Sequence, residues 1–509
     1  MVSKIFSLGY SGFQVYPVEI EVDIQEGLPA VSLIGLADTA VRESRDRVRS
    51  SIKNTHLRFP SKRITINLAP ARIKKEGTHF DLPIALGVIA SSHQAKLDLS
   101  SYIILGELSL EGKVKPIKGV FPMALYAWKQ GKKLILPSKN AKEAALVKGL
   151  QIYPVQSLAQ TLDFLSGASR IEPFTMDWEE LVNKQPQYSV DFSEVKGQIF
   201  AKRALEVSAA GMHNILLIGP PGVGKTMLAR RIPTILPDMS FEEVLEVTKI
   251  YSIAGFLDED KPFIGCRTWR SPHHTSSSAA LIGGGASIRP GEVTLAHHGV
   301  LFLDELPEFN RDCLEALRQP LEEGVVHISR AKGQAKFPSR FLFVGAMNPC
   351  MCGYYGSKSK NCNCSSFKIQ KYRNKISGPL LDRIDIHIEL AQIKTKELFS
   401  DGSDAEPSAV IKQRVEKARL AQRERFSGQN IFFNSQMNHR QVRNFCPLKG
   451  DVKDILIAAI KHFNFSARAY DKILKVSRTI ADLAGREDLT SEDISEVVGY
   501  RSMDKNLWV

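Results

Sequence analysis

A glycine-rich octapeptide that ends in lysine and threonine is the segment of this chain best suited to chemistry. Residues 219–226 read Gly-Pro-Pro-Gly-Val-Gly-Lys-Thr, between an apolar run at 214–218 and Met-Leu-Ala-Arg-Arg at 227–231. Strand, glycine loop and helix in this order match a Walker A phosphate loop. Glycines let consecutive backbone N–H groups turn toward phosphate oxygens, and the helix N-terminus adds partial positive charge at the same point.

The two polar side chains of this loop have separate expected roles. Lys225 can reach the β- and γ-phosphates of a nucleoside triphosphate, and the Thr226 hydroxyl can ligate Mg²⁺. We therefore predict that the chain binds ATP with Mg²⁺. The expected cofactor-binding residues are Gly219, Pro220, Pro221, Gly222, Val223, Gly224, Lys225 and Thr226.

Polar residues also end two later apolar runs. Val300–Leu303 is followed by Asp304 and Glu305, and the run 341–347 is followed by Asn348. A buried strand beside the phosphate loop would place Asp304 near the Mg²⁺ and Glu305 near the γ-phosphate, where it would polarise the attacking water. Asn348 could hydrogen-bond the γ-phosphate or orient the water, but an asparagine at a strand end is often only a turn former.

Two arginines are candidates to complete the site. Arg383 lies within Gly378–Asp385, and an arginine at a subunit boundary can enter the neighbouring site and neutralise charge on the transferring phosphoryl group. Arg468 lies at the start of a C-terminal helix and could contact the γ-phosphate. Either arginine alone would more often be a surface ion pair.

Four of the seven cysteines lie in one short segment. Cys350, Cys352, Cys362 and Cys364 form two C-x-C pairs that are nine residues apart. Four thiolates from one loop suit tetrahedral Zn²⁺, so we expect a structural zinc site at 350–364, with free thiols or an iron–sulfur cluster as alternatives. Basic residues surround this loop and could touch a polyanion, although the loop could also be a purely structural staple; they are Lys358, Lys360, Lys368, Lys371, Arg373 and Lys375.

The elements that position these residues follow from changes of pattern along the chain. Alternating strands and helices over 191–397 are typical of a parallel α/β sheet, and helices follow over 398–509. A linker is expected at 166–190, where periodicity is lost. Residues 1–165 are expected to form a separate α+β domain, with alternation at 15–24 and 64–69 and a helix over 37–53.

Composition narrows the class of partner and the compartment. The net charge of +13 favours polyanions, so nucleic acid is the leading partner class, with an inert basic surface as the alternative. We expect no membrane association, because the N-terminus lacks a signal-peptide pattern and no apolar stretch is long enough to span a bilayer. The odd cysteine count argues against a disulfide framework, and we expect a cytoplasmic protein.

Together these motifs resemble the AAA+ ATPases, and more closely the magnesium-chelatase-like branch with its ComM/YifB-type proteins. The resemblance spans essentially the whole chain. It is carried by 214–222, 271–275, 297–309, 377–385 and 476–483. It implies an AAA+ parallel-sheet core with a C-terminal helical lid, a ring that is expected to be a hexamer, and ATP at subunit interfaces. It further implies a sensor-1 role for Asn348, an arginine-finger role for Arg383 and a sensor-2 role for Arg468.

The resemblance also bears on two other regions. An insert at about 255–298, which contains His273, His274, His297 and His298, would form a hairpin that contacts DNA; packing and backbone caps fit these histidines better than metal binding. Residues 1–165 resemble the Lon-protease-like (ribosomal S5 domain 2-like) module at 75–83 and 106–116. Neither member of a Ser–Lys dyad is evident where that module would carry it, so we expect a binding platform and no peptidase activity.

ComM-type proteins are DNA branch-migration helicases that act in natural transformation, so the leading hypothesis is an ATP-dependent, ring-forming DNA motor of this kind. One alternative is the motor subunit of a metal chelatase, against which the cysteine loop and the Lon-like domain speak. Another is a non-catalytic DNA-binding regulator, against which the intact Lys225, Asp304 and Glu305 speak.

Overall fold

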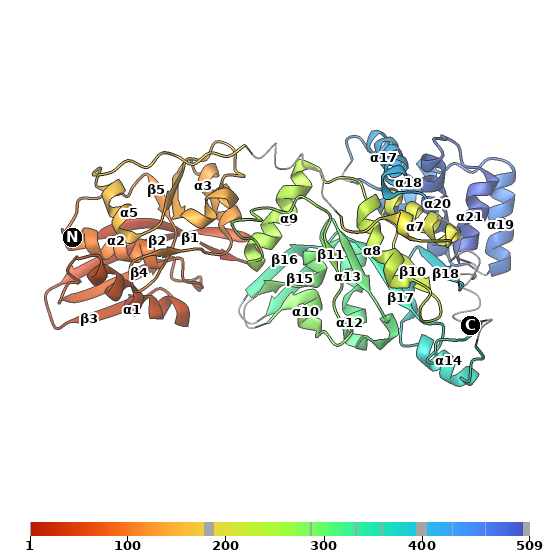
Figure 1. The fold of residues 1–509 in the computed structure, drawn as a ribbon, viewed down its shortest axis with the longest axis horizontal. Helices are drawn as coiled ribbons and strands as arrows, with labels where there is room; N and C mark the ends of the chain where they lie inside the picture. The colour runs from red at the N-terminus through yellow and green to blue at the C-terminus, as the bar shows by residue number, and fades with distance from the viewer. Residues whose placement is uncertain are drawn as a thin grey trace. The chain divides into compact units, whose positions relative to one another are not determined.

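The computed structural model describes residues 2–177, 188–285, 288–330, 333–357, 360–392, 405–429, 431–463 and 465–501 (Figure 1). The chain divides into two compact units, the first with residues 1–185, 244–265 and 333–335 and the second with 186–243, 266–332 and 336–509. This division differs from the expected domains, because 244–265 group with the N-terminal residues. Part of the expected linker, 178–187, and the boundary at 397–398 lie outside the described residues.

The first unit is built on a mixed seven-stranded sheet of order β3-β4-β2-β1-β5-β8-β9. Strand β2 pairs antiparallel with β1 and β4, and the remaining pairs are parallel. The strands are β1 Ser3–Ser11, β2 Gln14–Gln25, β3 Ala30–Ile34, β4 Arg63–Ala69, β5 Tyr102–Ile104, β8 Lys133–Pro137 and β9 Ile152–Val155; β6 Glu107–Leu108 and β7 Val114–Lys115 form a separate small hairpin.

The helices of this unit include α1 Thr39–Asn54, α2 Asp81–Ser91, α3 Val120–Lys129, α4 Ala141–Ala144 and α5 Leu158–Leu165. The helix expected over 37–53 is confirmed as α1. It begins after Asp38, because the Asp38 carboxylate accepts a hydrogen bond from the Val41 N–H at 2.8 Å. Its inner face buries Val41, Val48 and Ile52. The strands expected at 15–24 and 64–69 are confirmed within β2 and β4.

The second unit contains a five-stranded parallel sheet of order β11-β14-β17-β10-β18. Its strands are β10 Ile215–Ile218, β11 Trp269–Arg270, β14 Val300–Leu303, β17 Leu342–Met347 and β18 Ile386–Glu389. Continuous apolar runs form the central strands because both faces of the sheet are covered, and every residue of β10, β14 and β17 is buried. Strand β17 pairs with both β14 and the phosphate-loop strand β10, so it lies between them.

The other helices of this unit include α7 Ile199–Gly211, α8 Lys225–Ile235, α12 Arg311–Ala316, α13 Arg318–Glu323, α14 Ser366–Arg373 and α15 Gly378–Leu381, whereas most of α9 Phe241–Ala254 groups with the first unit. Within the expected insert, helix α10 Ser278–Ile282 is followed by the two-residue strands β12 Gly283–Gly284 and β13 Arg289–Pro290 and by α11 Glu292–Leu295. A second hairpin, which the sequence analysis did not anticipate, is formed by β15 Val325–Arg330 and β16 Gly333–Pro338.

The C-terminal region is helical, as expected. It consists of α17 Ser408–Arg425, α18 His439–Phe445, α19 Asp451–Phe463, α20 Ala467–Leu483 and α21 Ser491–Arg501 (blue in Figure 1). Ile473 and Val476 of α20 belong to the same hydrophobic core as Ile215 and Leu217 of β10. The C-terminal helices therefore pack into one core with the sheet that carries the phosphate loop.

Candidate active site

The phosphate loop connects β10 to α8 through backbone conformations that glycine adopts easily. Gly222 and Gly224 have φ values of 79° and 90°, in the left-handed region. Gly219 lies against the neighbouring segment, where a Cβ would come within 2.8 Å of the Leu390 carbonyl oxygen. No side chain caps α8, so the N–H groups of its first turn remain available to an anion.

Lys225 is held at the centre of this loop. Its ammonium group donates to the carbonyl oxygens of Gly219 at 2.7 Å and Pro220 at 3.0 Å, and to Oδ1 of Asn348 at 3.0 Å. Burial lowers the pKa of Lys225, and the nearby Asp304 carboxylate partly offsets this effect. The structure therefore brings together the phosphate-loop lysine and Asn348, which directly follows β17.

Thr226 and Asp304 also meet. The Thr226 hydroxyl donates to Oδ2 of Asp304 at 2.7 Å, although β17 lies between their strands. The other carboxylate oxygen of Asp304 accepts from the Glu305 N–H at 2.9 Å, which fixes the orientation of the carboxylate. A hydroxyl oxygen beside a carboxylate is the donor set that Mg²⁺ takes in nucleotide sites, so these residues fit the expected metal.

Glu305 sits in a strained backbone position and pairs with a histidine. Its φ and ψ of 52° and 46° are left-handed, which is uncommon for a residue with a side chain. Its Oε2 lies 3.1 Å from Nδ1 of His274. The Glu305 carboxylate is also near enough to Lys225 to act on the pKa of that lysine.

His274 was not predicted to act at this site. Its position follows from the register of two parallel strands, because Arg270 of β11 is paired with Leu301 of β14 and four further residues lead to His274 and Glu305. His273 packs on the His274 ring with centroids 4.1 Å apart. The other histidine pair agrees with the expected capping role, since Nδ1 of His297 accepts the Arg340 N–H at 3.0 Å.

The two candidate arginines lie near each other at the start of β18 rather than at the phosphate loop. Arg383 donates to the Pro379 carbonyl oxygen at 2.6 Å and pairs with Glu322. Arg468 is exposed and lies 3.9 Å from Asp382, the neighbour of Arg383 in the chain. Among the described residues, neither arginine has a hydrogen bond or ion pair with the group of Lys225, Thr226, Asp304 and Asn348.

A buried carboxylate ties this arginine loop to the rest of the unit. Asp385 lies 3.0 Å from the Lys472 ammonium of α20 and accepts the Asn214 N–H at 3.1 Å, directly before β10. Burial acts to raise the pKa of Asp385, but Lys472 and His213 outweigh it and hold that pKa well below its usual range. The Asp385 carboxylate therefore links the loop of Arg383 to α20 by an ion pair and to the start of the phosphate-loop strand by a hydrogen bond.

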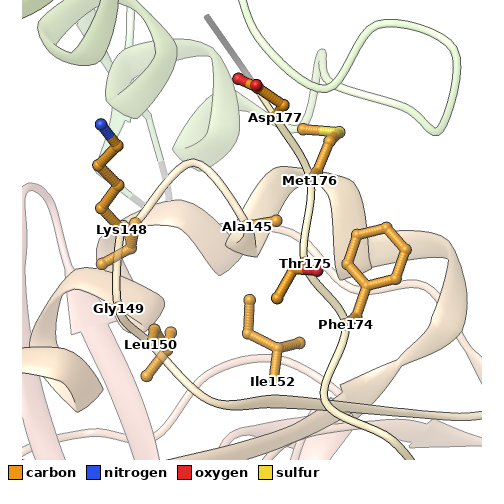
Figure 2. A pocket seen from close by; sticks show the side chains of 10 residues that line it. Ala145, Lys148, Gly149, Leu150, Ile152, Phe174, Thr175, Met176 and Asp177 are labelled. Carbon is orange, nitrogen blue, oxygen red and sulfur yellow. The ribbon is translucent and has the colours of Figure 1, made fainter.

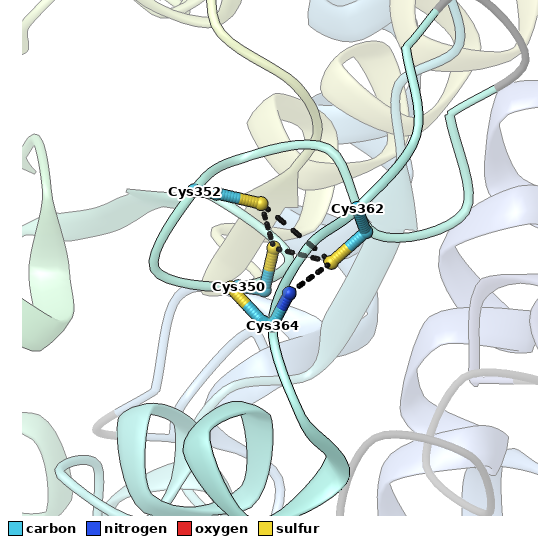
Figure 3. A group of neighbouring side chains, drawn as sticks. All are labelled: Cys350, Cys352, Cys362 and Cys364. Atoms are coloured by element: carbon cyan, nitrogen blue, oxygen red, sulfur yellow. Dashed lines mark hydrogen bonds between the residues drawn. The ribbon is translucent and has the colours of Figure 1, made fainter.

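The four cysteines of 350–364 form one cluster (Figure 3). Their sulfur atoms all lie within 4.8 Å of one another. The closest pairs are Cys350–Cys352 at 3.3 Å, Cys352–Cys362 at 3.6 Å and Cys350–Cys362 at 3.7 Å. Thiolates about 2.3 Å from one tetrahedral zinc ion lie about 3.8 Å apart, so the donor set fits zinc.

The cysteine loop contacts the phosphate loop. Gly353 has a φ of 86°, and a Cβ on it would lie 2.7 Å from Cδ of Pro221 and 3.9 Å from Cγ of Asn348. Arg373 of α14 donates to the Pro349 carbonyl oxygen at 3.2 Å. Of the basic residues predicted around this loop, Lys358 lies outside the described residues.

The first unit offers little chemistry by comparison. Its hollow of about 450 Å³ is bordered by apolar groups such as Leu150, Ile152 and Met176, with Lys148 and Asp177 at its edge (Figure 2). His79, within the segment 75–83 that resembles the Lon-protease-like module, is buried with Nε2 2.9 Å from the Leu8 carbonyl oxygen, and burial lowers its pKa to about 4. No helix among the described residues is long and apolar enough to cross a membrane.

Comparisons with known proteins cover nearly the whole chain. The family profile "Magnesium chelatase, subunit ChlI" matches residues 191–398, "Subunit ChlI of Mg-chelatase" matches 20–140, and the profile of the ChlI C-terminal part matches 405–501. Competence protein ComM of Haemophilus influenzae is 42% identical over 504 residues, which cover 98% of this chain and 97% of ComM.

Two further relatives set the range of the similarity. YifB of Escherichia coli is 42% identical over 498 residues, covering 97% of this chain and 96% of YifB. The chloroplastic magnesium-chelatase subunit ChlI of Oryza sativa is only 20% identical over 346 residues, covering 62% of this chain and 75% of the subunit. Because the bacterial relatives align over nearly their full length, the chain belongs to the ComM/YifB family of magnesium-chelatase-like AAA+ ATPases.

Proposed function

We propose that this chain is an ATP-dependent, ring-forming DNA motor that migrates branches in recombination intermediates during natural transformation. The observation that carries the proposal is the group of Lys225, Thr226, Asp304 and Asn348, which joins the ends of three adjacent strands at one phosphate loop. The net charge of +13 supports DNA as the partner, as does the similarity over nearly the full chain to a protein named for competence.

Each residue of the group has a proposed task. Bound ATP and Mg²⁺ would supply the phosphoryl group and the metal charge that neutralises its oxygens. Lys225 would bind phosphate oxygens, while Thr226 and Asp304 would hold the metal. Asn348 would orient the attacking water as sensor 1, and Glu305 would accept the proton of that water once it leaves His274.

The two arginines are proposed to act between subunits of a hexameric ring. Arg468 lies beside Asp382, the chain neighbour of Arg383, and neither arginine has a hydrogen bond to the phosphate loop of its own chain among the described residues. We therefore assign both arginines to the site of a neighbouring subunit. Arg383 would be the finger that neutralises charge on the transferring phosphoryl group, and Arg468 would serve as sensor 2. The lid contact of Asp385 with Lys472 would then transmit lid movement to the finger loop.

We further propose that Cys350, Cys352, Cys362 and Cys364 hold one structural Zn²⁺. The fit of the sulfur spacing to a tetrahedral ion supports this. Metal analysis of purified protein should find about one zinc per chain. Cys364→Ser should lose it, whereas Cys266→Ser, at an exposed cysteine outside the cluster, should retain it. Visible absorbance from iron and sulfide, or no metal at all, would refute the assignment.

A metal-chelatase motor is the second candidate, and the family profiles of ChlI favour it. The chelatase subunit of Oryza sativa is 20% identical to this chain and covers 62% of it, whereas ComM is 42% identical and covers 98%. We therefore rank the DNA motor first. Reconstitution of metal insertion into a porphyrin, with the partner subunits of a chelatase added, separates the two candidates.

The direct test of the proposed function uses a synthetic four-way junction with one labelled arm. With ATP, the wild-type chain should convert the junction into two duplexes, and the Glu305→Gln variant should bind ATP without doing so. A wild-type chain that hydrolyses ATP but leaves every junction intact would overturn the proposal.

A further inference from the structure

A basic groove with two phenylalanines lies between helix α14 and the segment that follows Glu305. We call it the Phe367 groove; it has a volume of about 640 Å³ and is lined by Phe309, Arg311, Phe367, Gln370, Lys371 and Lys375, among others. All of these residues belong to the second unit. None has a role in the candidate ATP site described above.

The aromatic part of the groove is unusually accessible. Phe367 is 74% exposed, although an isolated phenylalanine gains most from burial in the core. Phe309 is buried and forms the opposite wall. A planar ring that stacked on Phe367 would bury the apolar surface that this side chain exposes to water.

The polar part of the groove carries excess positive charge. The carboxylate of the lining, Glu308, forms an ion pair with Lys375 at 2.9 Å. Among the described residues, neither Arg311 nor Lys371 has an ion pair within 4 Å, although Arg311 is near enough to Glu315 to help lower the pKa of that carboxyl group. The amides of Gln370 and Asn374, one helical turn apart, lie on the same wall and can bond to the edge of a base.

An exposed aromatic ring beside an excess of cations and two amides is the chemistry that binds an unpaired nucleotide. The base stacks on the ring, and the phosphates on either side meet the lysine and the arginine. Duplex DNA fits less well, because its bases are already stacked within the helix. We infer that the Phe367 groove binds single-stranded DNA, an inference that rests on the proposed function and names its contact surface.

The groove also reaches the ATP site through a short path. Phe309 lies four residues after Glu305, and its ring meets the edge of His274 with centroids 6.4 Å apart. A strand seated in the groove would press on the residue that pairs with Glu305. Binding of single-stranded DNA would thus bias the position of the carboxylate that activates water.

Equilibrium binding of a fluorescent oligothymidine to the full-length chain tests the inference. Phe367→Ala should weaken binding about tenfold, since stacking on one aromatic side chain is worth about 1–3 kcal/mol per base. Phe432→Ala, at an exposed phenylalanine of the lid region, should bind as the wild type does. Phe367→Trp should restore affinity, and its fluorescence should be quenched by the stacked base.

The outcomes separate the inference from the function on which it rests. If the wild type binds no single-stranded DNA, the proposed function itself is contradicted. If the wild type binds and Phe367→Ala binds equally well, only the groove assignment is overturned. If Phe367→Ala loses DNA binding only because its rings dissociate in sedimentation, the groove is a subunit interface and the inference is likewise overturned.

Discussion

Replacing Gly353 by alanine is the sharpest test of the contact between the cysteine loop and the phosphate loop. The new Cβ would lie 2.7 Å from Cδ and 2.9 Å from Cγ of Pro221. Carbon atoms in ordinary contact are about 3.5–4.0 Å apart, so the loops must separate by about 1 Å. Pro221 belongs to the phosphate loop and its ring is rigid, which leaves little room for relief.

Two costs follow, and a second glycine of the same loop separates them. Any residue with a side chain at the φ of 86° of Gly353 costs about 1–2 kcal/mol in backbone strain. Gly356 has a φ of 77°, but a Cβ there would meet only Oε1 of Glu389 at 3.7 Å. Gly356→Ala therefore carries the strain without the clash and serves as the matched control.

We expect Gly353→Ala to lower the turnover of ATP at saturation by about ten- to a hundredfold, because a displacement of about 1 Å at a reacting centre costs about a hundredfold. Gly356→Ala should turn over ATP at nearly the wild-type rate. Both variants should keep the metal content of the wild type, and Gly353→Ala should be less stable than Gly356→Ala, because only Gly353→Ala adds a clash to the backbone strain. Equal turnover in the two variants would refute the idea that the cysteine loop positions the phosphate loop.

Two other substitutions test further contacts of the site. Asp385→Asn leaves the buried ammonium of Lys472 without its carboxylate, so we expect a loss of about 3–5 kcal/mol in urea unfolding. The pKa of Asp385 in the folded state lies below its ordinary value, so its contribution to the free energy of unfolding is fully present above about pH 4 and is lost as the pH falls further. The variant should lack this acid-dependent loss of stability. A stability profile against pH that is the same in the variant and the wild type would contradict the reasoning. His274→Ala frees Glu305 from its contact with His274, so basal ATP turnover should rise severalfold in a phosphate-release assay. His273→Ala leaves that contact in place and should change turnover little. A fall in turnover with His274→Ala would show that His274 orients Glu305 for catalysis instead.

The sequence was most informative where the chemistry is local. The phosphate loop could be predicted because eight consecutive residues carry it, and the strand ends at Asp304 and Asn348 because each closes an uninterrupted apolar run. The parallel sheet and the helical lid followed from the change of periodicity. The cysteine cluster could be predicted from spacing alone, since its four cysteines come from one short loop.

The contacts that the sequence did not reveal join distant segments. His274 meets Glu305 only because β11 pairs with β14 in one register, and that register depends on the whole sheet. The position of β17 between β14 and β10 likewise depends on pairing across the sheet and on no local pattern. Gly353 reaches Pro221 through the path of a loop between two segments that are far apart in the sequence.

Turnover of ATP in the presence and absence of DNA tests the central claim most directly. The wild-type chain should hydrolyse ATP slowly alone and several times faster with single-stranded or junction DNA, with the stimulation falling steeply as salt rises. The Glu305→Gln variant should bind ATP but hydrolyse it neither alone nor with DNA. A wild-type rate that no form of DNA alters at any ionic strength would contradict the account.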